Sequence, residues 1–569
     1  MTENKEITLE ALGAAAMQIL MQDPLYTVTE ADIRGNKYRV FANTPQTLPA
    51  MFAAAVEAHG DKEFLVYQDK RLSYRQLWSQ CCRFANGLRE ELGIKRGDVV
   101  ALAMRNYPEW CVAYMAVISL GATVAPLNAW WKGDELKYGL NDCKARFVIC
   151  DDRRFSYIEP FKDELDLTVI AVRDGAANAD YRLEDIIERT ADDTMPSVSI
   201  DPDDDYCIIY TSGSTGSPKG VVLTHLGCLS AVYSWSFIVE LMTKAKGVDA
   251  LWGDNPGVLL AVPLFHVTGS HSIFLLSLVR GRRIVMTYRW DAKEAADIIR
   301  NESLTNFVGV PTQSFELLDH VGDDGLPSLI DVGSGGAKRP AEHVRKIAAS
   351  FSGARASAGY GLSETNAIGC VISEQLYADR PDSTGRAAPP LTDIKIVKDG
   401  VDMAHGEVGE IWIRSPGNFR CYLNRPEETA AALTPDGWFR TGDLGYLDEQ
   451  EFVFIVDRMK ELIIRGGENV SCLEVENRVY EHNDIAEAAV FSVPDEKLGE
   501  RVGLVVYPKD GCTIEPQALR DFMGEKLAGF KNPERIWISP QSLPRLGTAK
   551  FDKLMIRKIA LTQPPHLSI

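Results

Sequence analysis

Short apolar runs alternate with longer amphipathic segments from about residue 46 to residue 350. The short runs predict strands at 99–104, 123–126, 146–150, 283–286, 306–310 and 329–332. The longer segments predict helices at 108–120, 133–141, 291–300 and 340–350. Because strands that alternate with helices form mostly parallel sheets covered by helices, this part of the chain predicts an α/β fold.

The pattern changes to turn-rich, alternating strands from about residue 385 to 456, with clear examples at 409–414 and 451–456. After Asp457 the charged stretch Arg458-Met-Lys-Glu461 leads into a smaller α/β segment. At 569 residues the chain is too long for a single core. We therefore predict a large N-terminal domain at 1–457 with a β-rich subdomain at 385–456, a hinge at 458–461, and a small α/β C-terminal domain at 462–569.

Charge and cysteine usage narrow the class of protein. The formal net charge of −19 argues against nucleic-acid binding, which requires a basic face. The eleven cysteines form no CxxC pair and no Cys/His cluster, so the sequence predicts no zinc site. Their apolar neighbours are typical of free, buried thiols in a reducing compartment.

The sequence indicates neither a targeting peptide nor a membrane-spanning segment. The segment Met1–Glu10 holds three glutamates and one lysine, unlike a signal or transit peptide, so we predict a cytoplasmic protein. The uncharged segment Val258–Val279 is long enough to span a bilayer. Proline, glycine, serine and histidine interrupt it, so we predict two buried elements there and no transmembrane segment.

A loop dense in glycine and hydroxyl groups, Tyr210-Thr-Ser-Gly-Ser-Thr-Gly-Ser-Pro-Lys-Gly220, follows the strand-like run at 206–209. Glycines let backbone N–H groups approach an anion closely, hydroxyls donate hydrogen bonds, and Lys219 adds positive charge. The loop therefore predicts a polyphosphate site. It is not a Walker A loop, because Gly220 follows Lys219. A flexible linker is the alternative, but a linker needs neither the preceding strand nor the lysine.

These residues resemble the phosphate-binding signature of the adenylate-forming superfamily: acyl-CoA synthetases, luciferases and the adenylation domains of peptide synthetases. Further motifs match in the same order along nearly the whole chain. The resemblance implies ATP, Mg²⁺ and coenzyme A as ligands and a mobile C-terminal domain. It assigns nucleotide binding in the loop to Thr211, Ser212, Gly213, Ser214, Thr215, Gly216 and Lys219.

The segment Tyr360-Gly-Leu-Ser-Glu-Thr365 resembles the second nucleotide motif of this superfamily. The resemblance implies that Tyr360 and Gly361 lie against adenine, and that Ser363, where the family usually has threonine, bonds to the α-phosphate. It implies that Glu364, together with Thr215, holds magnesium. The glycine-rich turn after the predicted strand at 329–332 adds Gly335, Gly336 and Ala337. Its lack of side chains would let adenine and the acyl group lie against backbone, and a plain tight turn is the alternative.

The ribose and the hinge have their own motifs. Asp443, at the end of the segment from 437 to 443, resembles the carboxylate that accepts hydrogen bonds from both ribose hydroxyls. Arg458 resembles the arginine that reaches ribose and phosphate, and Lys460 matches the pivot of the hinge. Lys550, in Pro544-Arg-Leu-Gly-Thr-Ala-Lys550, resembles the lysine of the first half-reaction, with Ala549 where the family has glycine.

Two further motifs concern the thiol and the acid. Gly466, Gly467 and Glu468 resemble the segment that enters the site after the small domain turns, and Lys531 matches a contact to CoA phosphate. Ser471-Cys472 replaces the usual Tyr-Pro. His266, in Pro263-Leu-Phe-His266, resembles the residue that gates and orients the acyl site, and a hydrogen-bonded core histidine is the alternative.

Together these motifs predict an AMP-forming acid–CoA ligase with Lys550, His266, Glu364 and Lys219 as catalytic residues. A carboxylate is already ionised at neutral pH, so its attack on the α-phosphate needs no general base, only alignment and charge neutralisation. The expected acyl pocket, lined by Trp235, Phe265, Val267, Thr268 and Gly269, carries no charge. An amino acid is disfavoured, because a buried ammonium needs a carboxylate partner.

A medium- or long-chain fatty acid is therefore the preferred substrate, and an aryl or polycyclic acid is the second choice. Transfer to a carrier-protein phosphopantetheine and a catalytically inactive nucleotide-binding regulator stay open as other functions. The presence of Lys550, Glu364 and Asp443 together argues against the regulator. The partners expected are the carboxylic acid, ATP and CoA, with no nucleic acid, and a homodimer is left open.

Overall fold

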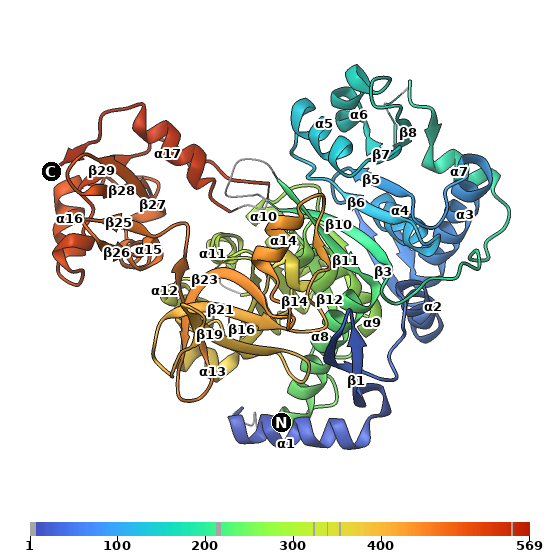
Figure 1. Ribbon diagram of the computed structural model, residues 1–569, viewed down its shortest axis with the longest axis horizontal. Helices are drawn as coiled ribbons and strands as arrows, with labels where there is room; N and C mark the ends of the chain where they lie inside the picture. Colours follow the sequence, from blue (N-terminus) through green and yellow to red (C-terminus); the bar gives the residue numbers. More distant parts are fainter. Residues whose placement is uncertain are drawn as a thin grey trace.

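A computed structural model describes residues 7–174, 176, 178–211, 218–322, 325–337, 339–351, 354–547 and 550–569. Its first sheet has the strand order β22-β11-β10-β6-β5-β7-β8-β9 (Figure 1). Pairing is parallel from β10 to β9 and antiparallel at β11 and β22. The strands are β5 (Val99–Ala103), β6 (Thr123–Pro126), β7 (Phe147–Asp151), β8 (Thr168–Val172), β9 (Tyr181–Arg182), β10 (Asp205–Thr211), β11 (Lys219–Thr224) and β22 (Cys421–Tyr422).

The second sheet has the order β18-β17-β16-β15-β14-β12-β13-β3-β4 and is parallel from β16 to β3. Its strands are β3 (Glu63–Tyr67), β4 (Lys70–Ser73), β12 (Gly257–Leu260), β13 (Arg283–Met286), β14 (Asn306–Gly309), β15 (Asp331–Gly335), β16 (Arg355–Tyr360), β17 (Cys370–Ser373) and β18 (Arg386–Ala387). The prediction of an α/β fold with mostly parallel sheets is confirmed.

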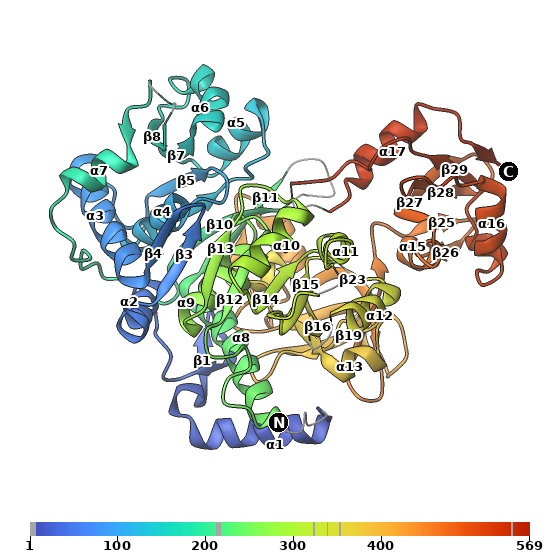
Figure 2. The same cartoon turned by 180° about the vertical axis from the view of Figure 1, so that it is seen from behind.

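Helices cover both sheets, and α1 (Leu9–Gln22) lies at the edge of the domain against α8 (His225–Lys246) (Figures 1 and 2). The other helices of this part of the chain are α2 (Leu48–His59), α3 (Tyr74–Leu92), α4 (Pro108–Ser119), α5 (Gly133–Asp142), α6 (Asp152–Ile158), α7 (Leu183–Arg189), α9 (Leu276–Arg280), α10 (Ala292–Asn301), α11 (Pro311–Leu318), α12 (Ala341–Ser350) and α13 (Glu374–Asp379). Short 3₁₀ turns lie at η1 (Pro24–Tyr26), η2 (Glu159–Phe161) and η4 (Ser363–Thr365), and η3 (Thr268–Leu275) is a π-helix.

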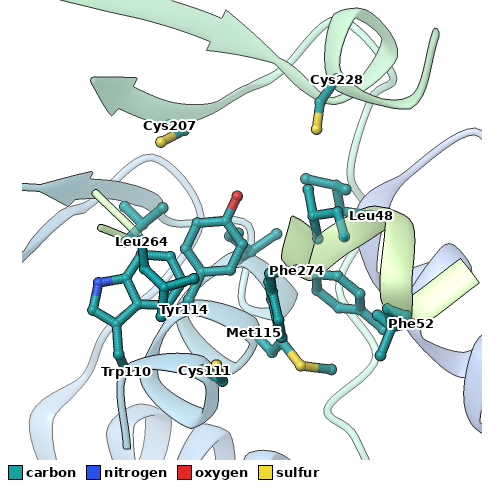
Figure 3. Packing of buried hydrophobic residues seen from close by; sticks show 14 of the residues in the cluster. Leu48, Phe52, Trp110, Cys111, Tyr114, Met115, Cys207, Cys228, Leu264 and Phe274 are labelled. Carbon is teal, nitrogen blue, oxygen red and sulfur yellow. The ribbon is translucent and has the colours of Figure 1, made fainter. Parts of the chain in front are cut away.

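Helix α4 lies in the core and is buried along its whole length. Trp110 stacks on Tyr114 at 4.6 Å between ring centroids, and Phe274 meets both rings edge-on at 6.3 and 6.1 Å (Figure 3). A helix that is apolar on every face is stable only when other elements surround it. Proline at its first turn supplies the helical φ without losing a needed N–H group.

Helix α8 is the one described helix that is long and apolar enough to cross a membrane. In the folded chain 78% of its apolar window is buried, as in the core helix of a globular domain. The segment 258–279, which raised the same question in the sequence, forms β12, the π-helix and the start of α9. Nine of the eleven cysteines are buried and all are free; Cys421 and Cys512 are partly exposed.

A third, antiparallel sheet has the order β20-β19-β21-β23-β24. The hairpin of β1 (Val28–Ile33) and β2 (Asn36–Phe41) forms a separate two-stranded sheet that contacts this part of the fold. Tyr38 donates from its hydroxyl to the carbonyl of Gly437 at 3.3 Å, and Arg39 pairs with Asp393 at 2.5 Å. The elements are β19 (Asp393–Lys398), β20 (Val401–Asp402), β21 (Gly409–Arg414), α14 (Pro426–Ala432), β23 (Phe439–Leu447) and β24 (Val453–Arg458).

The C-terminal segment forms a separate lobe (Figures 1 and 2). It contains β25 (Ile463–Arg465), β26 (Glu468–Val470), α15 (Cys472–Val479), β27 (Ile485–Asp495), β28 (Gly499–Pro508), α16 (Pro516–Gly524), η5 (Gly529–Lys531), β29 (Arg535–Ile538), α17 (Lys553–Leu561) and β30 (Leu567–Ser568). The residues between β24 and β25 form a turn that includes 459–461 of the proposed hinge, and Arg458 is the last residue of β24.

One strand prediction was displaced. The run at 329–332 predicted a strand, whereas β15 begins at Asp331 and continues through Gly335. The glycines that follow residue 332 predicted a loop, because glycine weakens a strand. In the fold they pair on both sides, Gly333 with Val308 of β14 and with Ser357 of β16, so the ladder extends into the glycine-rich motif.

Candidate active site

The tip of a hairpin from the small lobe reaches the end of β15. Leu546 donates its N–H to the carbonyl of Lys550 at 2.7 Å, and Asp552 donates its N–H to Pro544 at 2.9 Å. A Cβ built on Gly336, whose φ is +79°, would lie 3.2 Å from Cε and 3.5 Å from Nζ of Lys550. The ammonium group therefore lies directly over bare backbone, and a side chain at 336 would displace it.

Lys550 shares its electrostatic environment with three other charged groups. Burial, followed by the positive charge of Arg458, lowers the pKa of Lys550 to about 8, while Asp443 and Glu461 act in the opposite direction. Burial, with Lys550 nearby, lowers the pKa of His266 to about 3. His266 is thus a neutral imidazole at physiological pH, and within the described part of the chain its buried Nε2 has no hydrogen-bond partner.

Asp443 lies on β23 and is 3% exposed. Tyr360 donates from its hydroxyl to Oδ2 at 2.6 Å, and Nε of Arg458 lies 3.1 Å from Oδ1. Burial raises the pKa of Asp443, and Arg458 and Tyr360 oppose that shift. Tyr360, expected only to stack on adenine, also orients the carboxylate expected to bind ribose. The structure therefore brings Tyr360, Asp443, Arg458 and Lys550 together.

Glu364 lies in η4, directly after Ser363, and is 8% exposed. Burial raises the pKa of its carboxyl group, and the hydroxyl of Tyr422 donates to Oε1 at 2.8 Å. A carboxylate oxygen is a ligand that Mg²⁺ prefers, and a cation beside this carboxylate would offset its burial. Glu364 therefore fits a magnesium ligand. Thr215, its expected companion, lies outside the described residues.

The phosphate loop is described only at its two ends. Thr211 ends β10 and Lys219 begins β11, and the two pair in register across the hairpin. The ammonium of Lys219 pairs with Glu428 of α14 and lies 5.3 Å from the Tyr422 ring centroid. The predictions for the loop between these ends, Ser212, Gly213, Ser214, Thr215 and Gly216, fall outside the described residues.

The glycines of the nucleotide motifs are closely packed. A Cβ on Gly361 would lie 2.4 Å from the backbone of Ala367, so the tight turn after β16 requires glycine. Gly335 is half-buried at the end of β15, and Gly336 and Ala337 are exposed after it. Of these residues, Gly336 presents its backbone to Lys550.

The residues expected to line the acyl pocket have different neighbours in the fold. Trp235 lies against the backbone of β16, where a Cβ on Gly359 would approach the ring to 2.8 Å. The methyl group of Thr268 lies 3.9 Å from a Cβ built on Gly335. These two side chains and the glycines form an uncharged wall near the glycine-rich motif. Val267 instead packs into the main core.

The role of Gly269 in the acyl pocket stays a prediction, and the backbone around it is tightly packed. It is buried in the π-helix, and a Cβ there would lie 2.2 Å from the carbonyl oxygen of Pro263. The missing side chain lets the helix pack on the preceding turn, and provides no open channel. A bulky residue at 269 would therefore distort the fold before it shortened any pocket.

Phe265 faces a cavity of about 400 Å³ that both lobes line. Its ring meets Trp130 edge-on at 5.5 Å, and the guanidinium of Arg105 lies 3.9 Å from the Trp130 ring centroid and 5.4 Å from that of Tyr288. Gly547 of the small lobe packs on Trp130, since a Cβ there would lie 2.7 Å from its ring. The hairpin that carries Lys550 therefore closes one side of this cavity.

An arginine at the base of that hairpin joins the two lobes. Nη2 of Arg545 lies 2.7 Å from Oε1 of Glu487 in the small lobe and 3.1 Å from Oε1 of Glu316 in α11. Nε1 of Trp290 donates to the other oxygen of Glu316 at 2.5 Å. This ion pair holds the hairpin against the large domain.

The residues expected to bind CoA lie elsewhere. Gly466 and Gly467, with φ of +59° and +91°, form the exposed turn between β25 and β26, and Glu468 is the first residue of β26. Lys531 pairs with Glu474 at 2.7 Å. The contacts described for these residues lie within the small lobe, away from Lys550. Lys460 is exposed in the turn between the lobes.

Sequence reasoning missed three contributors: Tyr422, which holds Glu364, and the Glu316–Arg545 pair. Tyr422 precedes an ordinary Pro-Glu-Glu helix start and carries no motif that indicates its contact. Arg545 lies inside the lysine motif, but its partner is 229 residues away. Only the packing of the two lobes reveals that pair.

Comparison with known proteins agrees with the geometry. Residues 52–423 match the family described as AMP-binding enzyme, and residues 474–550 match the AMP-binding enzyme C-terminal domain. The long-chain-fatty-acid–CoA ligase FadD13 of Mycobacterium tuberculosis is 32% identical over 493 residues, covering 86% of this chain and 93% of that protein. A feruloyl-CoA synthase of Amycolatopsis is 32% identical over 492 residues, covering 86% and 94%.

A solved structure of ATP-bound MatB from Rhodopseudomonas palustris superimposes with a TM-score of 0.80 at 26% identity, covering 90% of this chain and 98% of that one. The resemblance therefore extends over both lobes.

Proposed function

Because the chain belongs to the AMP-binding enzyme family and is an AMP-forming acid–CoA ligase, we propose that its acid is a medium- or long-chain fatty acid. The reaction joins carboxylate and ATP to acyl-adenylate with release of pyrophosphate. The CoA thiol then displaces AMP to give acyl-CoA. The observation that carries the assignment of steps is the position of Lys550 over the bare backbone of Gly336, in the field of Asp443.

The first step joins two anions. Lys550 supplies a preorganised positive charge where negative charge develops at the α-phosphate. Asp443, oriented by Tyr360 and Arg458, positions the ribose. Magnesium, when held by Glu364, supplies further positive charge beside the departing pyrophosphate. The carboxylate needs no base, which is consistent with a neutral His266.

The second step needs a path for the thiol. The hairpin of Lys550 covers the cavity beside Phe265 and Trp130 through Gly547. We place the thiol's approach in this cavity, and a turn of the small domain at Lys460 removes the hairpin and brings in Gly466, Gly467 and Glu468. Two chemical demands on one site account for the separate C-terminal lobe.

The choice of acid is supported by the uncharged wall of Trp235 and Thr268 beside Gly335 and Gly359. The four residues described in this wall carry no charge, and a buried ammonium needs a carboxylate partner, which disfavours amino acids. The fatty-acid ligase FadD13 is among the similar proteins, and so is a feruloyl-CoA synthase. An aryl acid is therefore the second candidate.

The half-reactions of Lys550→Ala test this proposal. Acid-dependent pyrophosphate release should fall roughly 10²-fold, as expected for loss of one preorganised charge. Conversion of supplied acyl-adenylate to acyl-CoA should be retained. Lys558→Ala, which removes an exposed lysine of α17, serves as the matched control and should behave as wild type. Equal loss of both half-reactions in Lys550→Ala would contradict the assignment of Lys550 to the first step.

A further inference from the structure

A fully buried polar network lies between the acid side and the nucleotide side of the site. His271 and Asn366 are 0% exposed and Ser270 is 1% exposed. Nε2 of His271 lies 3.0 Å from Oδ1 of Asn366 and 2.7 Å from the hydroxyl of Tyr206, and Nδ1 lies 2.9 Å from Oγ of Ser270. A buried imidazole is costly unless it is hydrogen-bonded, and this one is bonded at both nitrogens.

The network joins three elements that carry the proposed site. His271 and Ser270 belong to the π-helix that begins at Thr268. Tyr206 lies on β10, the strand that leads into the phosphate loop. Asn366 follows the turn that holds Glu364. A π-helix inside a fold frequently marks a functional site, because its wider turn re-aims side chains.

The turn after Glu364 needs support from its surroundings. Asn366 and Ala367 have φ of +51° and +68°. Asparagine tolerates this left-handed conformation, but alanine adopts it rarely and needs surrounding contacts to hold it. Nδ2 of Asn366 donates to the carbonyl of Gly417 at 2.8 Å. Its Oδ1 therefore faces His271 as an acceptor, and the imidazole holds the other side of the turn.

The hydrogen bonds define the tautomer of His271. Burial lowers its pKa to about 4, so the ring is neutral and carries one N–H group. Since Oδ1 of Asn366 only accepts, the proton is on Nε2, and Nδ1 is left as an acceptor. The Ser270 hydroxyl lies between two acceptors, Nδ1 of His271 at 2.9 Å and the carbonyl oxygen of His266 at 3.0 Å.

We propose that His271 is a positioning residue for adenylation, whose Nε2–H group fixes the π-helix of the acid side to the turn behind Glu364. It touches neither substrate. It fixes the distance between Thr268 and Glu364, and this keeps the carboxylate of the acid substrate in line with the α-phosphate of ATP. This inference rests on the proposed roles of Thr268 and Glu364.

The test compares His271→Gln with His271→Leu. The glutamine amide can place a donor near the position of Nε2, whereas leucine fills the space and donates nothing. For His271→Leu, the KM values for ATP and for the acid should both rise about tenfold or more, as expected when a buried acceptor loses its donor. His271→Gln should restore both values to within a few-fold of wild type. His59→Leu, which removes a histidine bonded to the Val279 carbonyl, serves as the control and should change Tm but neither KM.

A purely structural role makes a different prediction. It would lower Tm and the fraction of active enzyme in His271→Leu while both KM values stayed at wild type, and that result would overturn the proposal. Equal damage from glutamine and leucine would also overturn it, because the donor would then be irrelevant. If His271→Leu does not fold, Ser270→Ala removes one bond of the network, and a smaller joint rise of both KM values is expected.

The test is independent of the identity of the acid. The KM values are measured with whichever acid the wild-type enzyme uses best. A wild type that activates no fatty acid contradicts the proposed substrate, while the comparison of His271 variants still stands or fails on its own result.

Discussion

The pH dependence of adenylation follows directly from the burial of Lys550. With a pKa of about 8, the ammonium is present below that pH and is lost as pH rises through it. The protonated fraction is about 0.9 at pH 7 and about 0.1 at pH 9. Without the ammonium the enzyme should retain only about 1% of its rate. The kcat/KM for ATP should therefore follow the protonated fraction and fall about ninefold from pH 7 to pH 9.

The assay is acid-dependent pyrophosphate release at saturating acid, with ATP varied at each pH. The pH profile of kcat/KM for ATP reports the free enzyme and should break near pH 8. The profile of kcat should break at higher pH, because bound ATP adds negative charge that favours the ammonium. Lys550→Arg keeps its charge throughout and should lose the alkaline break even if its rate is lower.

Two results would refute this reasoning. One is a wild-type profile of kcat/KM that stays flat to pH 10. The other is an alkaline break that persists unchanged in Lys550→Arg, which would assign the titration to another group.

Two further perturbations test the packing around the site. Glu316→Gln should weaken the ion pair that holds the Lys550 hairpin against the large domain, so pyrophosphate release should fall by about three- to tenfold while the thioester step from supplied acyl-adenylate is unchanged. Glu294→Gln, at an exposed position of α10, is the control, and an equal loss in both steps would argue against a specific role in adenylation. Gly269→Val should lower the free energy of unfolding by about 1–3 kcal/mol through its clash with Pro263; thermal denaturation measures this, and an unchanged Tm with a shorter preferred acid would restore Gly269 to the wall of the pocket.

The sequence predicted the large-scale fold well because local and tertiary preferences agree there. The strands at 123–126, 283–286 and 409–414 have the predicted bounds, since each is a short apolar or alternating run closed by turn residues. The shift of β15 arose where pairing with β14 and β16 overrode the local preference of glycine. The hairpin of β1 and β2 was not predicted, because half of its residues are polar and its contacts are with a sheet that is distant in the sequence.

The site was predictable where a motif carries its own chemistry. Lys550, Asp443 and Glu364 each belong to a short segment whose residue types imply their role. The fold brings Asp443 close enough to Lys550 for its negative charge to oppose the lowering of the lysine pKa by burial. Tyr422, Glu316 and His271 carry no such segment, and their roles arise from contacts between residues far apart in the sequence. At Gly269 the sequence shows a missing side chain, but it could not show that the Pro263 backbone lies where a Cβ would be.

The substrate is tested most directly by one series of acids. Wild-type enzyme is given ATP, CoA and straight-chain acids of increasing length, with acetate, an aromatic acid and free amino acids for comparison, and AMP and acyl-CoA are measured. Each methylene buried in an apolar pocket contributes about 0.8 kcal/mol, so kcat/KM should rise about fourfold per carbon until the pocket is full. Acetate and amino acids should be poor substrates throughout. A preference for acetate, strong activation of an amino acid, or a flat fatty-acid profile beside one strongly preferred aromatic acid would contradict the proposed substrate.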